Sequence, residues 1–362
     1  MAKKTLVPFG PQHPVLPEPV HLDLVLEDET VVQAVPQIGY VHRGLENLVD
    51  KRDFQQFTYI AERICGICSF GHSMGYSQAV ENLMGIEVPE RAEYLRVIFH
   101  EMSRMHSHLL WLGLAADAFG FESLFMHSWR LRERLLDIFE RTTGGRVILN
   151  FCIPGGVVHD IENTELEAIV STLRGMREDY DQIAATFLDD ASVRSRLSGV
   201  GYLSKADART YGCVGPMARA SGWDVDVRNN GLGAYSALAD FKPVTSQDGD
   251  CYARCQVRVE EVRQSIDIIT ELASKIPDGE TLEKIKGNPA EGAESLTRIE
   301  QPRGEAIYYI KGNGTKFLER CRVRTPTSTN IPGMCATLGG SDLADVPNIV
   351  LTIDPCISCS ER

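Results

Sequence analysis

The first forty residues alternate between apolar and polar positions. In the stretch VHLDLVLEDETVVQAV, Leu22, Leu24 and Leu26 fall on one face, and the charged run from Glu27 to Glu29 follows as a turn. A period of two is the side-chain period of a strand that buries one face. The pattern therefore predicts a small antiparallel sheet near the start of the chain.

From about Asp53 the apolar positions recur at steps of three and four, which is the spacing of one helix face. The segment RAEYLRVIFHEMSRMHSHLLWLGLAADAF predicts a long buried helix. A second helix is predicted from Ser123 to Thr143, ending at Gly144-Gly145. Two more long helices are predicted, from Asn163 to about Leu197 and from Asp250 to Lys275. The middle of the chain is therefore expected to be a helical bundle.

The last sixty residues return to a β pattern. In GEAIYYIKGNGTKFLERCRVR, strands are predicted around Ile307 to Ile310 and Phe317 to Val323, with Asn313-Gly314 as the turn between them. No internal repeat or low-complexity linker divides the chain, so we expect a single α+β domain. Its expected parts are an N-terminal β region over residues 1–50, a helical core over 51–290, and a β hairpin with a metal-binding tail over 300–362.

Composition and charge narrow the class of protein. Apolar residues make up 43% of the chain, enough for a sizeable core, and the formal net charge of −13 argues against a nucleic-acid surface. The start, MAKKTLVPFGPQHP, has no apolar signal core. The most apolar stretch, Leu109 to Phe121, is shorter than the ~20 residues that span a bilayer. We expect a soluble chain in a reducing compartment, where ten cysteines favour metal or redox roles over disulfides.

Two CxxC pairs are the strongest chemical signal. Cys65 and Cys68 lie in RICGICSFGH, and Cys356 and Cys359 lie in DPCISCSER. Four thiolates from two such pairs can bind a soft or borderline metal, and a structural zinc site is the simplest interpretation of the spacing alone. The pairs of zinc ribbons, however, usually lie within ~15–20 residues of each other. Here 288 residues separate Cys68 from Cys356, so a shared metal would join the two ends of a whole fold.

In their context, these two motifs resemble the signatures of the large, catalytic subunit of nickel–iron hydrogenases, RxCGxCxxxH and DPCxxCxxH/R. Four further stretches are similar to the group 4, Ech-type, membrane-bound energy-converting hydrogenases and to the quinone-site subunit of respiratory complex I: GPQHP, GYVHRGLENL, GPMARASGWDVDVR and GDCYARCQVRVEEVRQS. The complex I relative lacks the four metal-binding cysteines, whereas this chain has all of them. The resemblance covers nearly the whole chain and implies the hydrogenase large-subunit fold.

The resemblance also implies a NiFe(CN)2(CO) centre held by the four cysteines. Cys65 and Cys356 would bind nickel only, while Cys68 and Cys359 would bridge nickel to an iron that carries carbonyl and cyanide ligands. Thiolates are soft ligands that favour redox metals, and metal binding deprotonates them. The terminal thiolate of Cys356 would accept a proton when dihydrogen is split, which makes it an expected catalytic residue.

Further residues are implied around this centre. His72 stands where the family has a histidine bonded to a bridging sulfur; the alternative is a core histidine paired with a backbone carbonyl. Arg303, in EQPRGEA, matches the arginine over the cyanides and the open metal position, where it would orient and stabilise rather than act as a base. Asp354 would hold Arg303 by charge-assisted hydrogen bonds. Thr327, in RTPTSTN, matches a donor to a cyanide; the alternative is a turn threonine that satisfies the backbone.

Two carboxylates complete the implied site. Glu18, in VLPEPV, matches the glutamate that gates proton transfer in the family, and the alternative is an exposed loop carboxylate. Glu46, in RGLE, matches a carboxylate near a secondary magnesium or iron site. That site normally uses a C-terminal histidine as well, but this chain has Arg362 there. Arg362 cannot ligate a cation, and it could pair with Glu46 directly instead.

The chain departs from the uptake hydrogenases at RMHSHLL, where they read HDH with an aspartate close to the active-site arginine. Ser107 stands in place of that aspartate, so either Asp354 alone holds Arg303 or the surroundings have been rebuilt. His106 and His108 have i, i+2 spacing and point to different helix faces, which argues against a metal pair. One core histidine and one polar contact are expected.

The sequence therefore predicts the catalytic subunit of a peripheral hydrogenase on the cytoplasmic side of the cell membrane. It would interconvert protons and H2, with electrons from ferredoxin through a 4Fe-4S small subunit, and other hydrophilic and membrane ion-translocating subunits would complete the complex. Two alternatives remain open. One is a metal-free, complex-I-like quinone or coupling subunit, and the other is a scaffold stapled by structural zinc.

Overall fold

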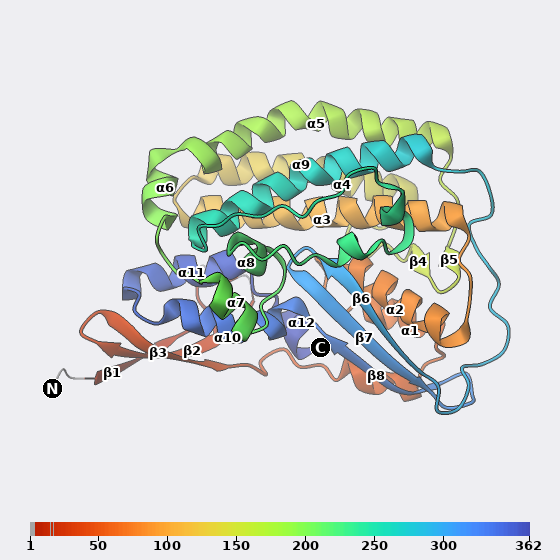
Figure 1. Ribbon diagram of the computed structural model, residues 1–362, viewed down its shortest axis with the longest axis horizontal. Helices are drawn as coiled ribbons and strands as arrows, with labels where there is room; N and C mark the ends of the chain where they lie inside the picture. Colours follow the sequence, from red (N-terminus) through yellow and green to blue (C-terminus); the bar gives the residue numbers. More distant parts are fainter. Residues whose placement is uncertain (1–3, 15, 17) are drawn as a thin grey trace.

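The computed structural model describes residues 4–14, 16 and 18–362, and its longest helices lie side by side along one edge of the molecule (Figure 1). These helices are α3 (Glu90–Ala118), α4 (Glu122–Thr143), α5 (Asn163–Asp189) and α9 (Cys251–Lys275). Two three-stranded antiparallel sheets lie on the other side of the molecule. The predicted α+β class, with a helical core and β elements near both ends of the chain, is confirmed.

The long helices begin and end where the sequence gives local reasons. Asp250 accepts a hydrogen bond from the backbone N–H of Ala253 and caps α9, and α4 ends at Gly144 with a φ of 78°. The segment predicted as one helix from Asn163 to Leu197 is two helices. The Asp190 side chain accepts from the backbone N–H groups of Ser192 and Val193, which starts α6 (Ala191–Leu197) in a new direction.

The first sheet confirms the alternating pattern at the start of the chain. Strands β1 (Lys4–Phe9), β2 (His21–Glu27) and β3 (Thr30–Gln37) pair in sequence order. Leu22, Leu24 and Leu26 are buried under it.

The second sheet contains one strand more than the predicted hairpin. β7 (Gly304–Gly312) and β8 (Leu318–Arg324) form that hairpin, and β6 (Glu294–Gln301) pairs with the other edge of β7. Arg303 therefore lies in the tight turn between β6 and β7.

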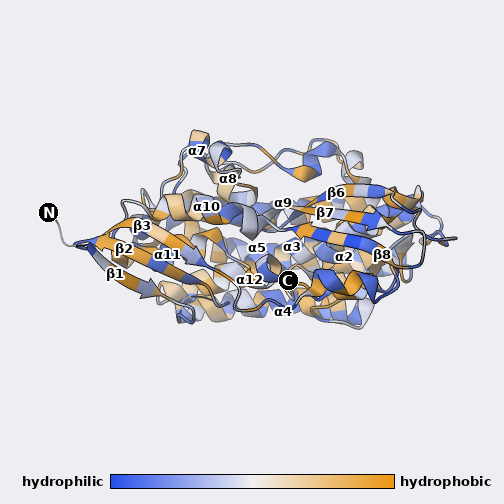
Figure 2. Ribbon diagram, turned by 90° about the horizontal axis from the view of Figure 1, so that it is seen from below, coloured by the Kyte–Doolittle hydropathy of each residue, from blue (hydrophilic) through white to orange (hydrophobic). Residues whose placement is uncertain are grey.

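Short elements connect these layers. They are η1 (Leu45–Asp50), α1 (Phe57–Glu62), α2 (Ser69–Met84), β4 (Cys152–Ile153), β5 (Gly156–Val157), α7 (Lys205–Thr210), α8 (Gly215–Ala220), η2 (Val227–Asn230), η3 (Gly233–Ala237), α10 (Pro326–Leu338), η4 (Leu343–Asp345), α11 (Val346–Ile353) and α12 (Ile357–Glu361). Seen from below, the two sheets lie at opposite ends of an elongated molecule, with α12 between them (Figure 2). Within the described residues, every helix is too short or too polar to span a lipid bilayer.

The core contains ion pairs as well as apolar side chains. Arg96 of α3 is fully buried and binds both oxygens of Glu81 from α2, at 3.0 Å for the pair Nη1 and Oε2 and 2.5 Å for Nη2 and Oε1. It also donates to the carbonyl oxygens of Ile153 and Gly156, at 2.8 and 3.0 Å. This guanidinium therefore fastens α2, α3 and the β4–β5 hairpin together.

Replacing Glu81 by alanine should leave the Arg96 guanidinium buried without its carboxylate. We expect the free energy of unfolding to fall by about 3–5 kcal/mol, the usual cost of breaking a buried pair. Urea unfolding followed by circular dichroism measures this loss. Asp179→Ala, which breaks the exposed pair with Arg134, is the matched control and should cost about 0–1 kcal/mol. Equal losses in both variants would contradict the role given to the buried pair.

Candidate metal centre

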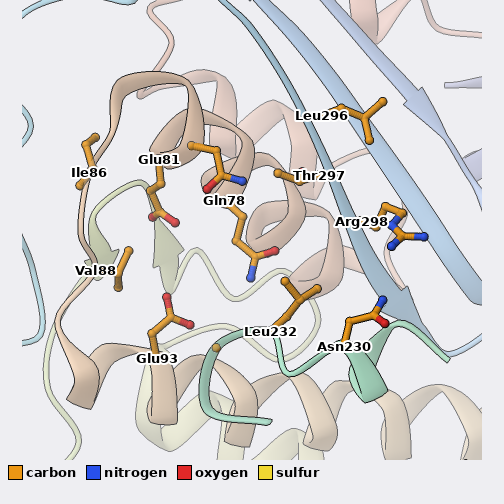
Figure 3. A pocket seen from close by; sticks show the side chains of 12 residues that line it. Gln78, Glu81, Ile86, Val88, Glu93, Asn230, Leu232, Leu296, Thr297 and Arg298 are labelled. Atoms are coloured by element: carbon orange, nitrogen blue, oxygen red, sulfur yellow. The ribbon is translucent and has the colours of Figure 1, made fainter. Parts of the chain in front are cut away.

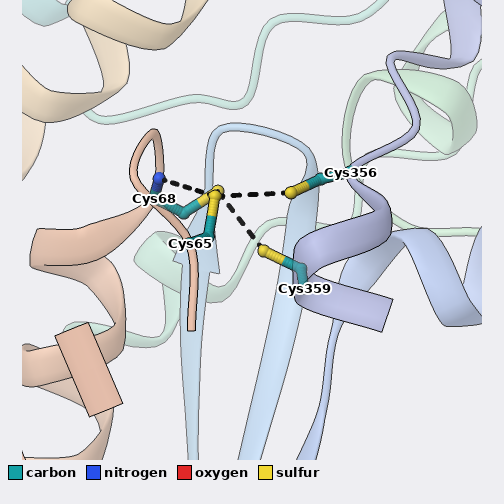
Figure 4. A group of neighbouring side chains, drawn as sticks. All are labelled: Cys65, Cys68, Cys356 and Cys359. Carbon is teal, nitrogen blue, oxygen red and sulfur yellow. Dashed lines mark hydrogen bonds between the residues drawn. The ribbon is translucent and has the colours of Figure 1, made fainter. Parts of the chain in front are cut away.

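Four cysteines from the two ends of the chain meet in one buried cluster (Figure 4). Cys65 and Cys68 come from the turn between α1 and α2, and Cys356 and Cys359 come from the start of α12. The four sulfur atoms all lie within 4.8 Å of one another. The Sγ atoms of Cys65 and Cys356 are 3.3 Å apart, and those of Cys68 and Cys359 are 3.8 Å apart. The structure thus brings together the four residues predicted to bind the metal.

The thiols influence one another's ionisation. Hydrogen bonds with the thiols of Cys356, Cys359 and Cys68 hold the pKa of Cys65 well below its ordinary value. Burial acts in the opposite direction and raises the pKa of Cys359. A cluster of this kind holds its protons unevenly and loses them when a cation binds.

Arg303 reaches the cluster from the β6–β7 turn. Its Nη1 donates to the Sγ of Cys68 at 3.4 Å and to the hydroxyl of Ser107 at 3.2 Å. Its Nη2 donates to the Oδ1 of Asp354 at 2.7 Å, and its Nε to the Asp354 carbonyl at 2.8 Å. Although burial opposes a charge here, Asp354 and the neighbouring Cys68 raise the pKa of Arg303 well above its ordinary value. Arg303 is therefore a fixed cation.

Asp354 occupies an unusual backbone position. Its φ of 59° places it in the left-handed region at the end of α11, directly before Pro355 and Cys356. The Nε1 of Trp111 donates to the carbonyl of Leu351 at 2.8 Å, which holds the end of α11 against α3. Burial raises the pKa of Asp354, against the opposing effect of the Arg303 guanidinium. The second carboxylate oxygen, Oδ2, is buried without a hydrogen-bond partner and remains available to a group in the site.

Two glycines allow the arginine turn to reach this place. Gly215, with a φ of 66°, and Gly304, with a φ of 126°, lie against each other. A Cβ at Gly215 would come within 2.2 Å of the carbonyl oxygen of Arg303. Side chains at either position would push the turn away from the sulfur cluster.

His72 lies beside one of the four sulfurs. Its Nε2 is 3.3 Å from the Sγ of Cys359, and its Nδ1 bonds to the hydroxyl of Tyr308 on β7. Burial lowers the pKa of His72 to about 4, so the ring is neutral near pH 7. Tyr308 was not anticipated, because a strand tyrosine carries no sequence signal for this contact.

Thr327 and Glu18 both contact the segment that carries the second cysteine pair. The hydroxyl oxygen of Thr327 accepts from the backbone N–H of Cys356 at 3.0 Å, so it does satisfy a backbone group, and its own proton is free to point elsewhere. The Oε2 of Glu18 accepts from the backbone N–H of Ile357 and, at 3.0 Å, from that of Ser358. The Ser358 hydroxyl also donates to Glu18. Glu18 is therefore held one residue from Cys356.

Glu46 pairs with arginines. Its Oε1 accepts from the Nε of Arg362 at 2.6 Å and from the backbone N–H of Val323 at 2.9 Å, and its Oε2 accepts from the Nη1 of Arg322 at 2.8 Å. The direct pairing with Arg362 is as expected from the sequence. Among the described residues, Glu46 belongs to no group of three or more potential metal ligands. A magnesium or iron ion near Glu46 stays a prediction without further support.

The residues before Glu46 in the stretch GYVHRGLE, to which no role was assigned from the sequence, hold the last helix in place. Arg43 donates to the carbonyls of Ile64 and Ser358, at 2.7 and 2.9 Å, and so bridges the two cysteine segments. The carboxylate of Glu361 accepts from the backbone N–H groups of Gly39 and Val41. The contacts with Ser358 and Glu361 join residues more than 300 positions apart, and no local pattern identifies them.

The histidines of RMHSHLL make separate contacts. The Nε2 of His106 accepts from Arg132, and the Nε2 of His108 bonds to the Oε2 of Glu261 at 2.9 Å. Neither belongs to a group of three or more potential metal ligands among the described residues. Ser107 fills the aspartate position and accepts from Arg303, so Asp354 is the one carboxylate in contact with that guanidinium in the described structure.

This donor set fits a soft redox metal. Four convergent thiols, a fixed cation at 3.4 Å from one sulfur and a buried, unpartnered carboxylate oxygen lie together. A closed structural zinc site needs only the four sulfurs. The additional charged groups are suited to a centre that binds and transforms a further ligand.

Comparisons with known proteins agree with this geometry. The family described as the 49-kDa subunit of respiratory-chain NADH dehydrogenase matches residues 118–292 and 282–362, and the family of nickel-dependent hydrogenases matches residues 43–114. The alpha subunit of the membrane-bound hydrogenase of Pyrococcus furiosus is 38% identical, over 98% of this chain and 87% of its own. The carbon monoxide-induced hydrogenase of Rhodospirillum rubrum is 38% identical, over 98% and 99%.

Two further relatives carry other names. One subunit of the F(420)H(2) dehydrogenase of Methanosarcina mazei is 35% identical, over 100% of this chain and 98% of its own. A chain of the membrane-bound sulfane sulfur reductase, an archaeal respiratory membrane complex, superposes with a TM-score of 0.93 at 29% identity, covering 99% of this chain and 98% of that one.

Fold, sulfur cluster and relatives together define a hydrogenase-like catalytic subunit, an oxidoreductase of the kind found in membrane-bound respiratory complexes. The chain belongs to the family of group 4 nickel–iron hydrogenase large subunits, which is related to the 49-kDa subunit of complex I.

The neutral state of His106 predicts a loss of stability in acid. Its Nε2 accepts from the Arg132 guanidinium, and burial, together with that cation, lowers its pKa to about 3. In the unfolded chain the histidine has a pKa of about 6.5. As the pH falls from that value to 5, the unfolded chain therefore binds a proton that the folded chain does not, and the free energy of unfolding falls by up to about 2 kcal/mol.

Urea unfolding at a series of pH values measures this dependence. Gln at position 106 can still accept from Arg132 but does not titrate, so His106→Gln should flatten the slope by that amount. His127→Gln, at an exposed position on α4, should leave it unchanged. An unaltered slope in the His106 variant would show that His106 does not titrate as inferred.

Proposed function

We propose that this chain is the catalytic subunit of a membrane-associated nickel–iron hydrogenase. In this proposal, electrons come from a ferredoxin through a 4Fe-4S small subunit. The protein lies peripherally on the cytoplasmic side of the membrane, and membrane subunits couple the reaction to ion translocation. The observation that carries the proposal is the convergence of Cys65, Cys68, Cys356 and Cys359 beneath the Arg303 guanidinium.

The cysteines and Arg303 have different roles, which follow from their contacts. Cys65 and Cys356 would hold nickel, and Cys68 and Cys359 would bridge it to the iron. When bound, nickel and iron with carbonyl and cyanide ligands supply the redox chemistry that interconverts two protons and two electrons with H2. Arg303, held by Asp354 at 2.7 Å, keeps a fixed positive charge over the site, where it orients and stabilises rather than accepting protons.

Proton movement would start at Cys356. Its Sγ, as a terminal thiolate, can hold a proton and pass it to the carboxylate of Glu18. The backbone N–H groups of Ile357 and Ser358, the two residues after Cys356, hold that carboxylate in place. His72 would tune the charge of the Cys359 sulfur through its Nε2, and Thr327 would direct its hydroxyl proton into the site.

Metal analysis of the anaerobically purified complex tests the proposal against its alternatives. Nickel with matching iron supports it, zinc without nickel indicates a structural staple, and no metal at all indicates a coupling subunit of the complex I type. Cys359→Ala should remove nickel and hydrogen turnover together, because it deletes a bridging ligand. Cys321→Ala alters a buried thiol outside the cluster and should retain both. Turnover that survives in the Cys359 variant would rule out its bridging role.

Glu18→Gln should separate proton transfer from metal binding. The amide keeps the shape of the carboxylate but cannot carry a proton, so hydrogen–deuterium exchange should slow by about 10²-fold or more. Nickel content should remain at the native level, because Glu18 contacts the backbone and the Ser358 hydroxyl rather than the sulfurs. Glu29→Gln, at an exposed turn, is the control. An unchanged exchange rate would place the proton route elsewhere.

A further inference from the structure

Next to the metal centre lies a second group of charged residues that the proposed function does not use. We call it the ionic cluster. Its side chains are all buried, and they come from α3, α8, the segment around η2, α9 and β6. The members are Glu101, Arg104, Arg219, Asp226, Arg228, Glu261 and Glu300.

In most carboxylates of the ionic cluster, the negative charge is balanced by close contacts with guanidinium groups. Glu261 accepts from Arg219 and Arg104, each at 2.6 Å, and bonds to His108 at 2.9 Å. The guanidinium of Arg228 binds Asp226 at 2.7 Å and Glu101 at 3.1 Å. The hydroxyl groups of Tyr235 and Ser265 also donate to Glu101, at 2.5 and 2.6 Å.

Glu300 is the least compensated. Its Oε1 accepts from the Nη1 of Arg219 at 2.7 Å, and its Oε2 accepts from the backbone N–H of Val227 at 3.1 Å. Arg219 is shared with Glu261 and also lies 3.3 Å from Asp226, a like charge beside Glu300. The contact of Arg104 with Glu300 is to the backbone carbonyl, at 3.4 Å, and not to the carboxylate.

The charges of the ionic cluster do not balance when every group is ionised. Three guanidiniums face four carboxylates within the ionic cluster; a further buried guanidinium, Arg258, interacts with Glu261 but also with Asp354 and Arg303. Burial keeps the neighbouring His100 and His108 neutral by lowering their pKa values to about 3 and about 4. A surplus buried charge is costly, so one carboxylate should hold a proton. Burial and the charge of Asp226 raise the pKa of Glu300 to about 7, whereas, despite burial, Arg219 and Arg104 hold that of Glu261 well below its ordinary value.

Two short segments reach both the ionic cluster and the metal centre. On α3, Arg104 and His108 bind Glu261, while Ser107 contacts Arg303. On the β6–β7 hairpin, Glu300 belongs to the ionic cluster, and Arg303 lies 3.4 Å from the Cys68 sulfur.

Gln301 lies between these two residues of the hairpin. It is buried, both polar atoms of its side chain lack partners, and the side chain packs on Gly71, directly before His72. A change of charge at the sulfurs therefore acts on Glu300 through the buried protein interior, where electrostatic effects are stronger than in water.

We propose that Glu300 is a proton-holding site that follows the charge of the metal centre. It binds a proton from solvent when the centre gains an electron and returns that proton when the centre loses it. The step forms one O–H bond on one carboxylate oxygen, and the electron is the one delivered to the centre by the partner iron–sulfur chain or by an added reductant. The inference rests on the proposed function.

A cavity lies beside the segment that joins η2 to η3. Asn230, Leu232 and Gly233 line a cavity of about 370 Å³, into which the Gln78 and Glu93 side chains point (Figure 3). These residues connect η2, which contains Arg228, to η3, which contains Tyr235. The cavity therefore lies next to the segment that carries Arg228 and Tyr235, both of which contact Glu101 of the ionic cluster.

Infrared difference spectroscopy on the holoenzyme complex tests the proposal directly. Between about pH 6 and about pH 8, a protonated buried carboxyl band should disappear, with about half of its intensity lost near pH 7. The band should shift in D2O, vanish in Glu300→Gln and move in Glu300→Asp, which keeps a carboxyl group. Glu305→Gln, on the same hairpin but paired with Arg298 and Arg324, should leave it unchanged. Glu62, whose pKa burial raises to about 7, could give a second band, so Glu62→Gln subtracts that contribution.

The response of the Glu300 band to reduction tests whether the proton on Glu300 follows the charge of the metal centre. At pH 7, the Glu300 band should grow when the complex is reduced with H2 or dithionite. A native protein without a band assigned to Glu300, or with one that is indifferent to reduction, would overturn the proposal. Loss of the proposed function would have a different signature, namely no nickel and no hydrogen turnover, and the pH titration of the band would still decide whether Glu300 holds a proton.

Discussion

Four thiol groups within 4.8 Å of one another cannot all ionise in a protein interior unless positive charge lies among them or beside them. The surrounding structure supplies part of this positive charge. Arg303 places a permanent cation against Cys68, and Asp354 holds that cation in one orientation. The remaining positive charge would come from a bound metal ion, so metal binding and thiol deprotonation would be parts of one equilibrium.

The same elements position the centre and surround it with charge. Helix α3 contributes Trp111 to the end of α11, Ser107 to Arg303 and Arg104 to the ionic cluster, while the β6–β7 hairpin carries Glu300 and Arg303 three residues apart. Side chains on rigid, packed elements keep their geometry when a neighbouring charge changes. A change at the sulfurs is therefore met by a redistribution of protons among fixed groups rather than by movement of the backbone.

The sequence was most informative where chemistry is tied to residue type and spacing. The two CxxC pairs were identifiable because a soft metal needs thiolate donors, and the alternation of Leu22, Leu24 and Leu26 predicted its strand. Arg303 and His72 were identified through the resemblance of the stretches around them to the family's motifs. Tyr308, Arg43 and Glu361 escaped prediction because their partners lie hundreds of residues away and their own positions carry no periodic signal. The break at Asp190 was missed because the apolar steps of three and four continue on both sides of it.

The position of the cysteines also sets an order of events during synthesis. Cys65 and Cys356 are 291 residues apart, so at about 5–20 residues per second the first pair leaves the ribosome roughly 15–60 s before the second. During that interval Cys65 and Cys68 form an incomplete thiol site, open to any soft cation and to oxidation. Which cation such a site binds would thus depend on the order of synthesis as well as on affinity, because the first pair of thiols is exposed before its partners exist.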